Sequence, residues 1–132
     1  GWTGTFSSRV YLDTLREVFI ELSKKYDYIL KIIGNFDYQL DGVNLEVIDW
    51  KKRTEIEDLH TFDIGVYPLI KDKWSLGKGA LKAMQYMSIG IPTVATNYGT
   101  NLQVIDNNEN GILVDTSKEW IEKLEYLILM IL

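Results

Sequence analysis

The sequence predicts an α/β domain in which helices cover both faces of a doubly wound, parallel sheet of about six strands. Short apolar runs alternate along the chain with amphipathic stretches, the pattern of a parallel sheet that is buried on both faces. An apolar content of 46% predicts a true hydrophobic core. The length of 132 residues suffices for one well-packed domain and is too short for two.

The expected strands are apolar runs bounded by glycine or polar residues. They cover residues 2–5, 28–33, 43–48, 64–69, 93–96 and 111–114. In the third run, Val43, Leu45 and Val47 alternate with the remaining residues, so we expect these three to share one face of the sheet. Right-handed crossovers between the runs would make the sheet open and doubly wound.

Four or five helices are expected where apolar residues recur at helical spacing. The first begins after Ser7 and Ser8, which are expected to cap it, and another covers residues 77–88. Capping-box spacing predicts two more, from Thr54 and from Thr116, each with a glutamate three residues later. The expected inner residues of the first and last helices are Tyr11, Leu15, Val18, Leu22, Trp120, Leu124, Leu127 and Ile131.

Composition excludes several classes of function. The formal charge of −5 argues against a nucleic-acid surface, because phosphate binders concentrate lysine and arginine on one face. The absence of cysteine excludes disulfides and fits a cytoplasmic location, with a membrane-peripheral one left open for the full-length protein. The longest apolar run, residues 127–132, is far shorter than the roughly 20 residues of a membrane span. No Asp-x-Asp or His/Cys ligand spacing occurs, so we expect neither a metal nor a cofactor.

The two ends of the sequence indicate a fragment of a longer protein. Gly1-Trp2-Thr3 is typical of the middle of a strand, and the chain stops at Met130-Ile131-Leu132 without a polar tail. Domains usually end in polar, frayed residues, so we expect one domain that lacks its neighbour.

The segment that carries chemistry covers residues 73–87, where a polar loop with two glycines leads from a strand into a helix. Helical spacing places Lys78, Lys82 and Gln85 within about 60° of one another on one helix face. The opposite face, suited to packing on the sheet, consists of Ala80, Ala83, Met84 and Met87. In open α/β sheets, ligands bind beyond the carboxyl ends of the strands. The candidate loops are therefore residues 4–8, 48–52, 71–79 and 97–101.

Two lysines at the start of a helix predict a site for a doubly charged anion such as a diphosphate. Backbone N–H groups are free at a helix N-terminus, and the helix dipole favours negative charge there. Gly77 and Gly79 would let a ligand approach the backbone closely. The alternative is that Lys78 and Lys82 only solvate a surface helix, and their spacing alone does not decide between the two interpretations.

Several motifs extend over nearly the whole chain. GKGALKAMQYMSIGIPTVA at residues 77–95 precedes Tyr98-Gly99-Thr100-Asn101 and Asn110-Gly111-Ile112-Leu113. Upstream are GWTGT at residues 1–5 and FDIGVYPL at 62–69, and Trp120 follows. In this order and spacing, the motifs resemble the group 1 retaining glycosyltransferases of the GT-B fold. The resemblance implies a Rossmann-like domain over residues 1–132 that binds a nucleotide-sugar donor, with a separate N-terminal domain for the acceptor.

The resemblance also implies roles for single residues. The family has two glutamates eight positions apart, and the second, which holds the ribose, falls on Gln85. An amide still accepts and donates hydrogen bonds, so this role survives without the charge. The first glutamate, placed near the donor sugar, falls on Gly77 and is lost. The backbone N–H groups of residues 78–80 are implied to meet the sugar and phosphates.

A second departure concerns basic residues that usually follow the first strand, which fall here on Thr5 and Val10. Since neither is basic, we infer that Lys78 and Lys82 neutralise the leaving diphosphate and are the catalytic residues, with Arg9 a weaker candidate. The expected binding residues are Gly4, Ser7, Ser8, Trp50, Gly77, Lys78, Gly79, Ala80, Lys82, Gln85 and Asn101.

Four further residues have separate interpretations. Trp50 ends a strand where the family places the nucleobase; it could line that pocket, although a core or lid aromatic is the favoured alternative. His60 has no visible partner network and is expected on the surface. Asp63 is expected to make a turn contact. Asn101 lies in a loop near the expected phosphates, which makes it a binding candidate.

The resulting hypothesis is transfer of a sugar, with retention, from a nucleotide diphosphate sugar to a glycan, lipid or small-molecule acceptor. This domain alone should bind the nucleotide and transfer nothing. One alternative is another nucleotide-sugar enzyme of the GT-B fold, such as an epimerase. The other is a non-catalytic α/β interaction module, which would have an acidic cluster at the strand ends and no affinity for nucleotides.

Overall fold

The computed structural model describes residues 1–131, so Leu132, the last residue of the apolar run 127–132, lies outside the described part. Six parallel strands form two three-stranded sheets, with the orders β1-β2-β3 and β4-β5-β6. The strands are β1 (Trp2–Thr3), β2 (Leu30–Ile33), β3 (Leu45–Ile48), β4 (Gly65–Tyr67), β5 (Thr93–Thr96) and β6 (Ile112–Val114). Their number and order along the chain confirm the prediction, and each lies within or on its expected run.

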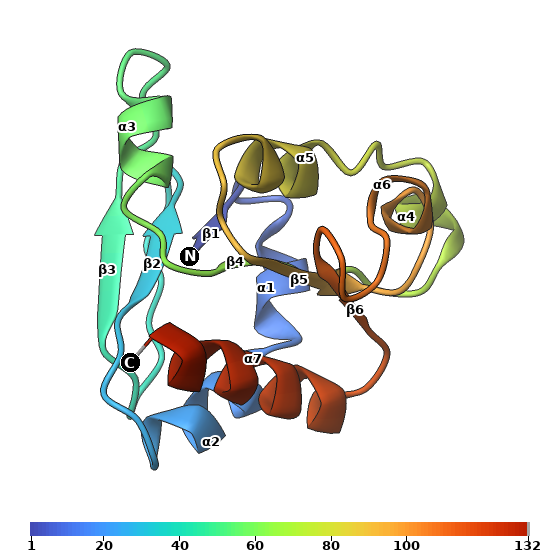
Figure 1. Cartoon of the computed structure of the whole chain (residues 1–132). Coiled ribbons are helices and arrows are strands. Elements are labelled where there is room, and N and C mark those ends of the chain that lie inside the picture. Colours follow the sequence, from blue (N-terminus) through green and yellow to red (C-terminus); the bar gives the residue numbers. More distant parts are fainter. Residues whose placement is uncertain (132) are drawn as a thin grey trace.

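Within residues 1–131, seven helices connect and cover the strands (Figure 1). They are α1 (Arg9–Asp13), α2 (Arg16–Ser23), α3 (Glu55–Leu59), α4 (Lys73–Leu76), α5 (Leu81–Ser88), α6 (Asn101–Val104) and α7 (Ser117–Ile131). No helix of residues 1–131 is long and apolar enough to cross a membrane.

Helices lie on both faces of the sheet. Two pairs of consecutive residues show this, Ile32 and Ile33 on β2 and Val94 and Ala95 on β5. Ile32 and Val94 belong to the larger core cluster, which includes buried side chains of α1, α2 and α7. Ile33 instead packs with residues of α3 and α5, and Ala95 with residues of α5 and the end of α6. Consecutive strand residues point to opposite faces, so the arrangement has three layers, α/β/α. The expected doubly wound, Rossmann-like α/β fold is confirmed.

Backbone hydrogen bonds join the two sheets edge to edge. The Gly1 nitrogen donates to the Ile64 carbonyl (2.6 Å), and the Val66 N–H donates to the Gly1 carbonyl (3.0 Å). These bonds place β1 beside β4, giving the overall strand order 3-2-1-4-5-6. The connection after β1 therefore runs toward β2, and the connection after β4 runs in the opposite direction, toward β5. Open α/β sheets bind ligands at the boundary between two such strands.

A tyrosine hydroxyl separates the two strands at this boundary. In a regular parallel ladder, the Val66 carbonyl would accept from the next N–H of β1, since its own N–H already donates to β1. Instead, the buried Tyr86 hydroxyl accepts from the Thr3 N–H (3.2 Å) and donates to the Val66 carbonyl (3.3 Å). Burial raises the pKa of the Tyr86 phenol, so it stays protonated and able to donate. The tyrosine thus opens the sheet at the carboxyl ends of β1 and β4.

Glycine on β4 makes room for that tyrosine. A β-carbon at Gly65 would lie 2.5 Å from the Tyr86 ring, closer than such atoms approach. The same ring packs edge-on against Phe62, with centroids 5.9 Å apart. Gly65 and Tyr86 are therefore a matched pair, one residue supplying the space that the other fills.

The expected helix over 77–88 is wrong in its first turn. Residues 73–76 form α4, begun by Asp72, whose carboxylate accepts from the Ser75 N–H (2.8 Å). The chain then stays irregular until Leu81, because Ala80 has a left-handed backbone with φ of 52°. On α5, Ala83 is buried as expected, but Met84 is 40% exposed and Tyr86 takes the inner position.

The first helix is interrupted rather than continuous. The Thr14 hydroxyl bonds back to the Tyr11 carbonyl (2.6 Å), and the backbone makes one tight turn before α2 begins. Ser8 precedes α1, but its side chain caps nothing there, so that expectation is wrong. The expected inner residues of both helices are confirmed as buried: Tyr11, Leu15, Val18 and Leu22.

The two predicted capping boxes have opposite outcomes. The Thr116 hydroxyl accepts from the Glu119 N–H (3.2 Å), which confirms the start of α7. Thr54 makes no such bond, and its hydroxyl donates to the Asp58 carboxylate instead (3.0 Å). On α7 the inner face consists of Trp120 and Leu124, with Leu127 half-buried and Ile131 exposed, contrary to expectation.

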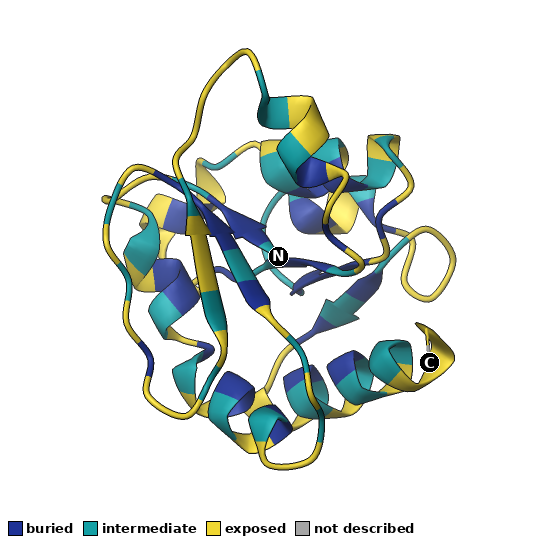
Figure 2. Cartoon of the chain, turned by 90° about the vertical axis from the view of Figure 1, so that its left-hand side faces the viewer, coloured by how far each residue is buried: buried dark blue, intermediate teal, exposed yellow. Residues whose placement is uncertain are grey.

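The outer strand β3 also differs from its prediction. Only β2 pairs with it among the described residues, and Figure 2 shows it largely exposed beside buried neighbours. Val47 is 37% exposed, whereas Leu45 and Ile48 are half-buried against opposite faces. Val43 and Leu45 pack against the larger core cluster on one face, as expected, but Val47 does not, because an edge strand is covered only in part.

Candidate functional site

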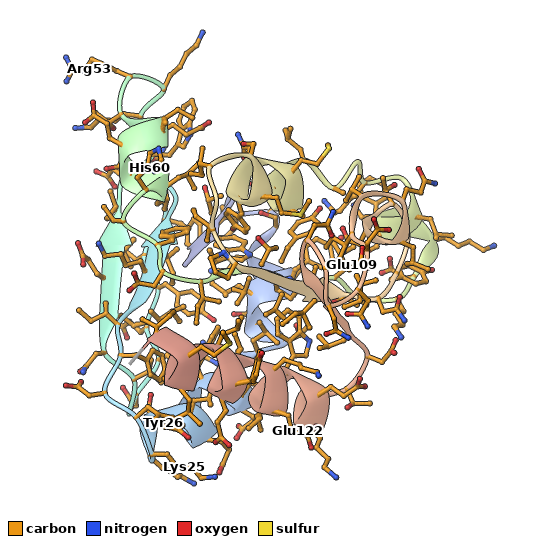
Figure 3. The ribbon with its side chains drawn as sticks, viewed as in Figure 1. Lys25, Tyr26, Arg53, His60, Glu109 and Glu122 are labelled. Atoms are coloured by element: carbon orange, nitrogen blue, oxygen red, sulfur yellow. The ribbon has the colours of Figure 1, made fainter. Side chains whose placement is uncertain are left out.

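The loops that follow the strands meet at one edge of the sheet. The arrows of β2 and β3 in Figure 1 point toward the end of the molecule where α3 lies. In Figure 3, His60 and Arg53 lie at this end and Lys25 and Tyr26 at the opposite end. All six strands are parallel, so their carboxyl ends share this edge, which holds most of the expected site residues.

Lys78 lies at the β1–β4 boundary. Its ammonium group is 4.9 Å from the ring centre of Tyr11, the buried tyrosine of α1. Tyr67, at the end of β4, has a phenol pKa raised by burial and further by the nearby Tyr11. A cation held over an aromatic ring is positioned without being neutralised. The ring of Tyr11 therefore holds the Lys78 ammonium group near the end of β4, where the sheet opens.

Lys82 adds a second charge three residues before Gln85, on the first turn of α5. Neither Lys78 nor Lys82 forms a salt bridge or a side-chain hydrogen bond within residues 1–131. The same holds for other exposed cations, such as Arg53 and Lys73, whereas Lys25 pairs with Glu125 and Lys71 with Asp115. Lys78 lies outside the helix, so the expected single helix face holds only for Lys82 and Gln85.

The loop before α5 presents backbone donors to the same region. The Lys78 N–H already donates to the Ser75 carbonyl (3.1 Å), so it is not available as expected. The N–H groups of Gly79 and Ala80 make no hydrogen bond within residues 1–131. A β-carbon at Gly79 would meet no atom within 4 Å, so the space beside it is open. Gly77 is exposed and ends α4.

Hydroxyl groups form a compact cluster after β1. The Ser8 hydroxyl accepts from the Thr5 N–H (2.8 Å) and donates to the Thr5 carbonyl (3.1 Å). The Thr5 and Ser7 hydroxyl oxygens are 3.0 Å apart. A β-carbon at Gly4 would collide with the Trp2 ring and the Ser8 hydroxyl, so this turn requires glycine.

Arg9 is directed at Phe6 on the same loop. Its guanidinium carbon lies 4.3 Å from the Phe6 ring centre, and its buried Nε has no hydrogen-bond partner. Arg9, like Lys78, Lys82 and Arg53, is thus a cation of this edge that forms no ion pair within the described residues.

Trp50, Glu55 and Gln85 come together from three elements. The Trp50 indole N–H donates to the Glu55 Oε2, and the Gln85 Nε2 donates to the Glu55 Oε1 at 3.1 Å. The Trp50 backbone N–H donates to the Asn35 side chain (2.9 Å), which ties the loop after β3 to that after β2. Trp50 is 39% exposed and belongs to neither core cluster on its side, so it lies at the rim of the site.

Other candidates lie elsewhere or inside the protein. Asn101 is fully buried and donates from Nδ2 to the Thr96 carbonyl (2.9 Å), so its side chain reaches no ligand in this conformation. Its role in binding stays a prediction. His60 is exposed, as expected. Asp63 makes no hydrogen bond within residues 1–131, so the expected turn contact is wrong.

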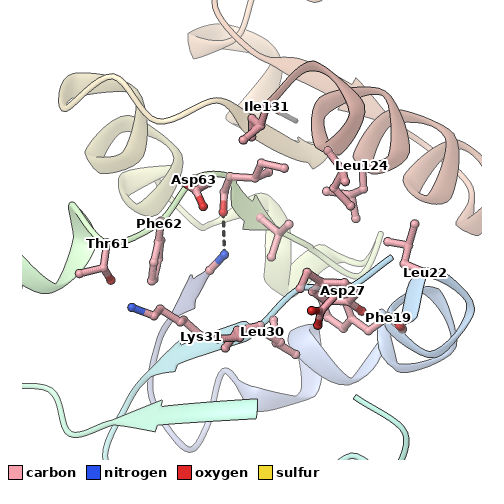
Figure 4. A pocket seen from close by; sticks show the side chains of 16 residues that line it. Phe19, Leu22, Asp27, Leu30, Lys31, Thr61, Phe62, Asp63, Leu124 and Ile131 are labelled. Atoms are coloured by element: carbon pink, nitrogen blue, oxygen red, sulfur yellow. Dashed lines mark hydrogen bonds between the residues drawn. The ribbon is translucent and has the colours of Figure 1, made fainter. Parts of the chain in front are cut away.

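A cavity of about 520 Å³ lies at the opposite edge, under the amino ends of β1 and β2 (Figure 4). Its lining is mainly apolar, with side chains such as Phe19, Leu22, Phe62 and Leu124. Its only cationic side chain is Lys31, which pairs with Glu46 (3.8 Å). A diphosphate would find no free cation here, so we place the candidate site at the open carboxyl edge instead.

Sequence reasoning missed two residues of this region. Glu55 was assigned to the first turn of a capped helix, and Tyr11 to the core. Glu55 lies seven residues beyond the end of the third strand (55 − 48), and no local signal in the sequence connects it to Gln85. No sequence signal connects Tyr11 to Lys78, which are 67 positions apart (78 − 11).

Comparison with known families gives one match. The profile of the family described as "Glycosyl transferases group 1" matches residues 1–129. A search of curated proteins found no match.

Proposed function

Because this chain belongs to the glycosyl transferases group 1 family, we propose that it is the domain that binds the nucleotide-sugar donor. On this proposal, the full enzyme has the GT-B fold and a second domain holds the acceptor. The sugar passes from the nucleotide diphosphate to that acceptor with retention of configuration.

The observation that carries the proposal is a pair of lysines without ion-pair partners in residues 1–131, Lys78 beside Tyr11 and Lys82 on the first turn of α5. Lys78 and Lys82 flank the exposed Gly79 and the buried Ala80, whose N–H groups have no acceptor within residues 1–131. Two cations and two free donors match a group with two negative charges and several oxygen acceptors. A diphosphate meets this description, and a neutral sugar or a peptide does not.

The chemistry is one of stabilising a leaving group. As the glycosidic bond breaks, negative charge grows on the diphosphate, and fixed cations favour that state over the bound donor. Each such contact typically lowers the activation free energy by about 3 kcal/mol, which corresponds to roughly a hundredfold in rate. Since glycine replaces the family's first glutamate at position 77, we assign the contacts to the donor sugar to backbone groups of this loop.

We expect calorimetry of this chain with UDP, GDP, ADP and TDP to detect binding of at least one diphosphate. The matching monophosphate should bind about tenfold or more weakly, because it loses charge-assisted contacts to one of the lysines. Binding should be weak, should survive EDTA and should occur without sugar transfer, since positioning the acceptor requires the second domain.

Equal affinity for mono- and diphosphates would contradict the assignment of the lysines. No binding to any of the four, in a sample whose unfolding is cooperative, would favour a non-catalytic interaction module. Interconversion of the donor sugar without its transfer, measured on the full-length enzyme, would favour an epimerase.

A further inference from the structure

Glu55 lies between two residues of the expected nucleoside-binding region and contacts both. Its two carboxylate oxygens accept one hydrogen bond each, from the Trp50 indole and the Gln85 amide. The three residues come from the end of β3, from α3 and from α5. Each side chain is only partly buried, so the cluster can be reached from the surface.

The contact with Glu55 fixes the direction of the Gln85 amide. Since Nε2 donates to the carboxylate, Oε1 is turned the other way, where it is buried and has no hydrogen-bond partner. An unpaired buried acceptor costs free energy unless a donor reaches it. Glu55 therefore holds Gln85 with its acceptor directed away from the carboxylate.

The cluster offers acceptors to a ligand. Each carboxylate oxygen of Glu55 can accept a second hydrogen bond, whereas the Gln85 Oε1 is buried and reaches a ligand only if its side chain moves. A ligand that satisfies the carboxylate oxygens must donate from adjacent positions, as the two neighbouring hydroxyls of a ribose do. The indole of Trp50 beside them provides a flat apolar surface of the kind on which a nucleobase stacks.

We infer that Glu55 supplies the carboxylate that binds the ribose hydroxyls of the donor nucleotide, next to the amide of Gln85. This inference rests on the proposed function, because it requires a nucleotide at this edge. The family's glutamate is replaced by the neutral Gln85, and Glu55 on α3, 30 positions earlier in the chain, then supplies the missing negative charge. Hydrogen bonds to a charged acceptor are about twice as strong as those to a neutral one, so Glu55 should determine the preference for ribose.

The test compares ADP, GDP and UDP with their 2′-deoxy forms by calorimetry. In the unaltered protein, the ribonucleotide of the bound base should bind about tenfold more tightly than its deoxy form. Glu55→Gln should lower this ratio to about threefold or less, because the charged acceptor is lost. Glu57→Gln removes the same charge from an exposed position of the same helix and should leave the ratio unchanged.

A second variant separates the two acceptors. Gln85→Ala removes the amide but leaves Glu55 in place, so part of the ribose preference should persist, and the double variant should lose it completely. Complete loss of preference in Gln85→Ala alone would overturn the role of Glu55. Equal weakening of ribonucleotide and 2′-deoxynucleotide binding in Glu55→Gln would also overturn this role, because Glu55 would then only hold its neighbours in place.

The outcomes also separate this inference from the proposed function. A protein that binds nucleoside diphosphates without preference for ribose would overturn the role of Glu55 and leave donor binding intact. A folded protein that binds none of the three diphosphates would overturn both.

Discussion

Lys78→Ala is expected to weaken nucleoside diphosphate binding about tenfold to a hundredfold, while the melting temperature barely changes. Hydrogen bonds to charged groups contribute about 1.5–3 kcal/mol, which corresponds to this range of affinity. Lys78 makes no ion pair within residues 1–131, and its ammonium lies 4.9 Å from the ring centre of Tyr11. Its removal therefore deprives the ligand of a charge and the fold of little. Calorimetric titration and thermal unfolding of the same sample measure the two effects.

Lys25→Ala is the matched control, because it removes the same charge at the opposite end of the molecule (Figure 3). Lys25 pairs with Glu125 at 3.7 Å on an exposed surface, and such pairs contribute little to stability. Its affinity for the nucleotide should match that of the unaltered protein. If Lys78→Ala keeps its affinity and loses stability, then Lys78 is a structural residue and the diphosphate site lies elsewhere.

Tyr86→Phe is expected to destabilise the fold by about 1–3 kcal/mol. The hydroxyl serves two buried backbone groups, the Thr3 N–H and the Val66 carbonyl, and phenylalanine leaves both without a partner. The aromatic ring remains in place beside Gly65, so β1 and β4 cannot close to bond directly. Urea unfolding at equilibrium measures the loss as a lower midpoint with an unchanged slope.

Tyr126→Phe serves as the control, since Tyr126 is 55% exposed on α7 and should tolerate the loss of its hydroxyl. Unchanged stability in Tyr86→Phe would mean that the two strands pair directly in solution. The tyrosine would then not separate the two halves of the sheet.

The strands could be predicted from the sequence because their signal is local. Residues 93–96 combine β-branched side chains with a preceding Gly-x-Pro turn, and β5 occupies these positions. The burial of Leu15, Val18 and Leu22 likewise follows from helical spacing alone. Such patterns report which face of an element is apolar, and a packed core then fixes the rest.

The loop before α5 could not be predicted in the same way. The left-handed backbone of Ala80 is unusual for a residue with a side chain and persists only where the surrounding structure imposes it. Lys78 was therefore placed on a helix that begins three residues later. The buried position of Tyr86 also escaped prediction, because it depends on the space left by Gly65, 21 positions earlier (86 − 65).

The candidate site was predictable as a set of loops but not as a set of contacts. The carboxyl edge followed from the parallel topology, and Lys78, Lys82 and Gln85 were found through their spacing and the family resemblance. The contact between Gln85 and Glu55 joins residues that share no local pattern, so only the folded chain reveals it.

The most direct test of the donor-domain account is the location of a bound nucleotide, measured by amide chemical shifts in NMR. During titration with the diphosphate that binds most tightly, the largest changes should occur in residues 4–8, 50–55 and 77–85. These segments come together only at the carboxyl edge, so joint changes in all three would support the account. Changes centred on Phe19, Leu22 and Leu124, which line the cavity at the opposite edge, would contradict it.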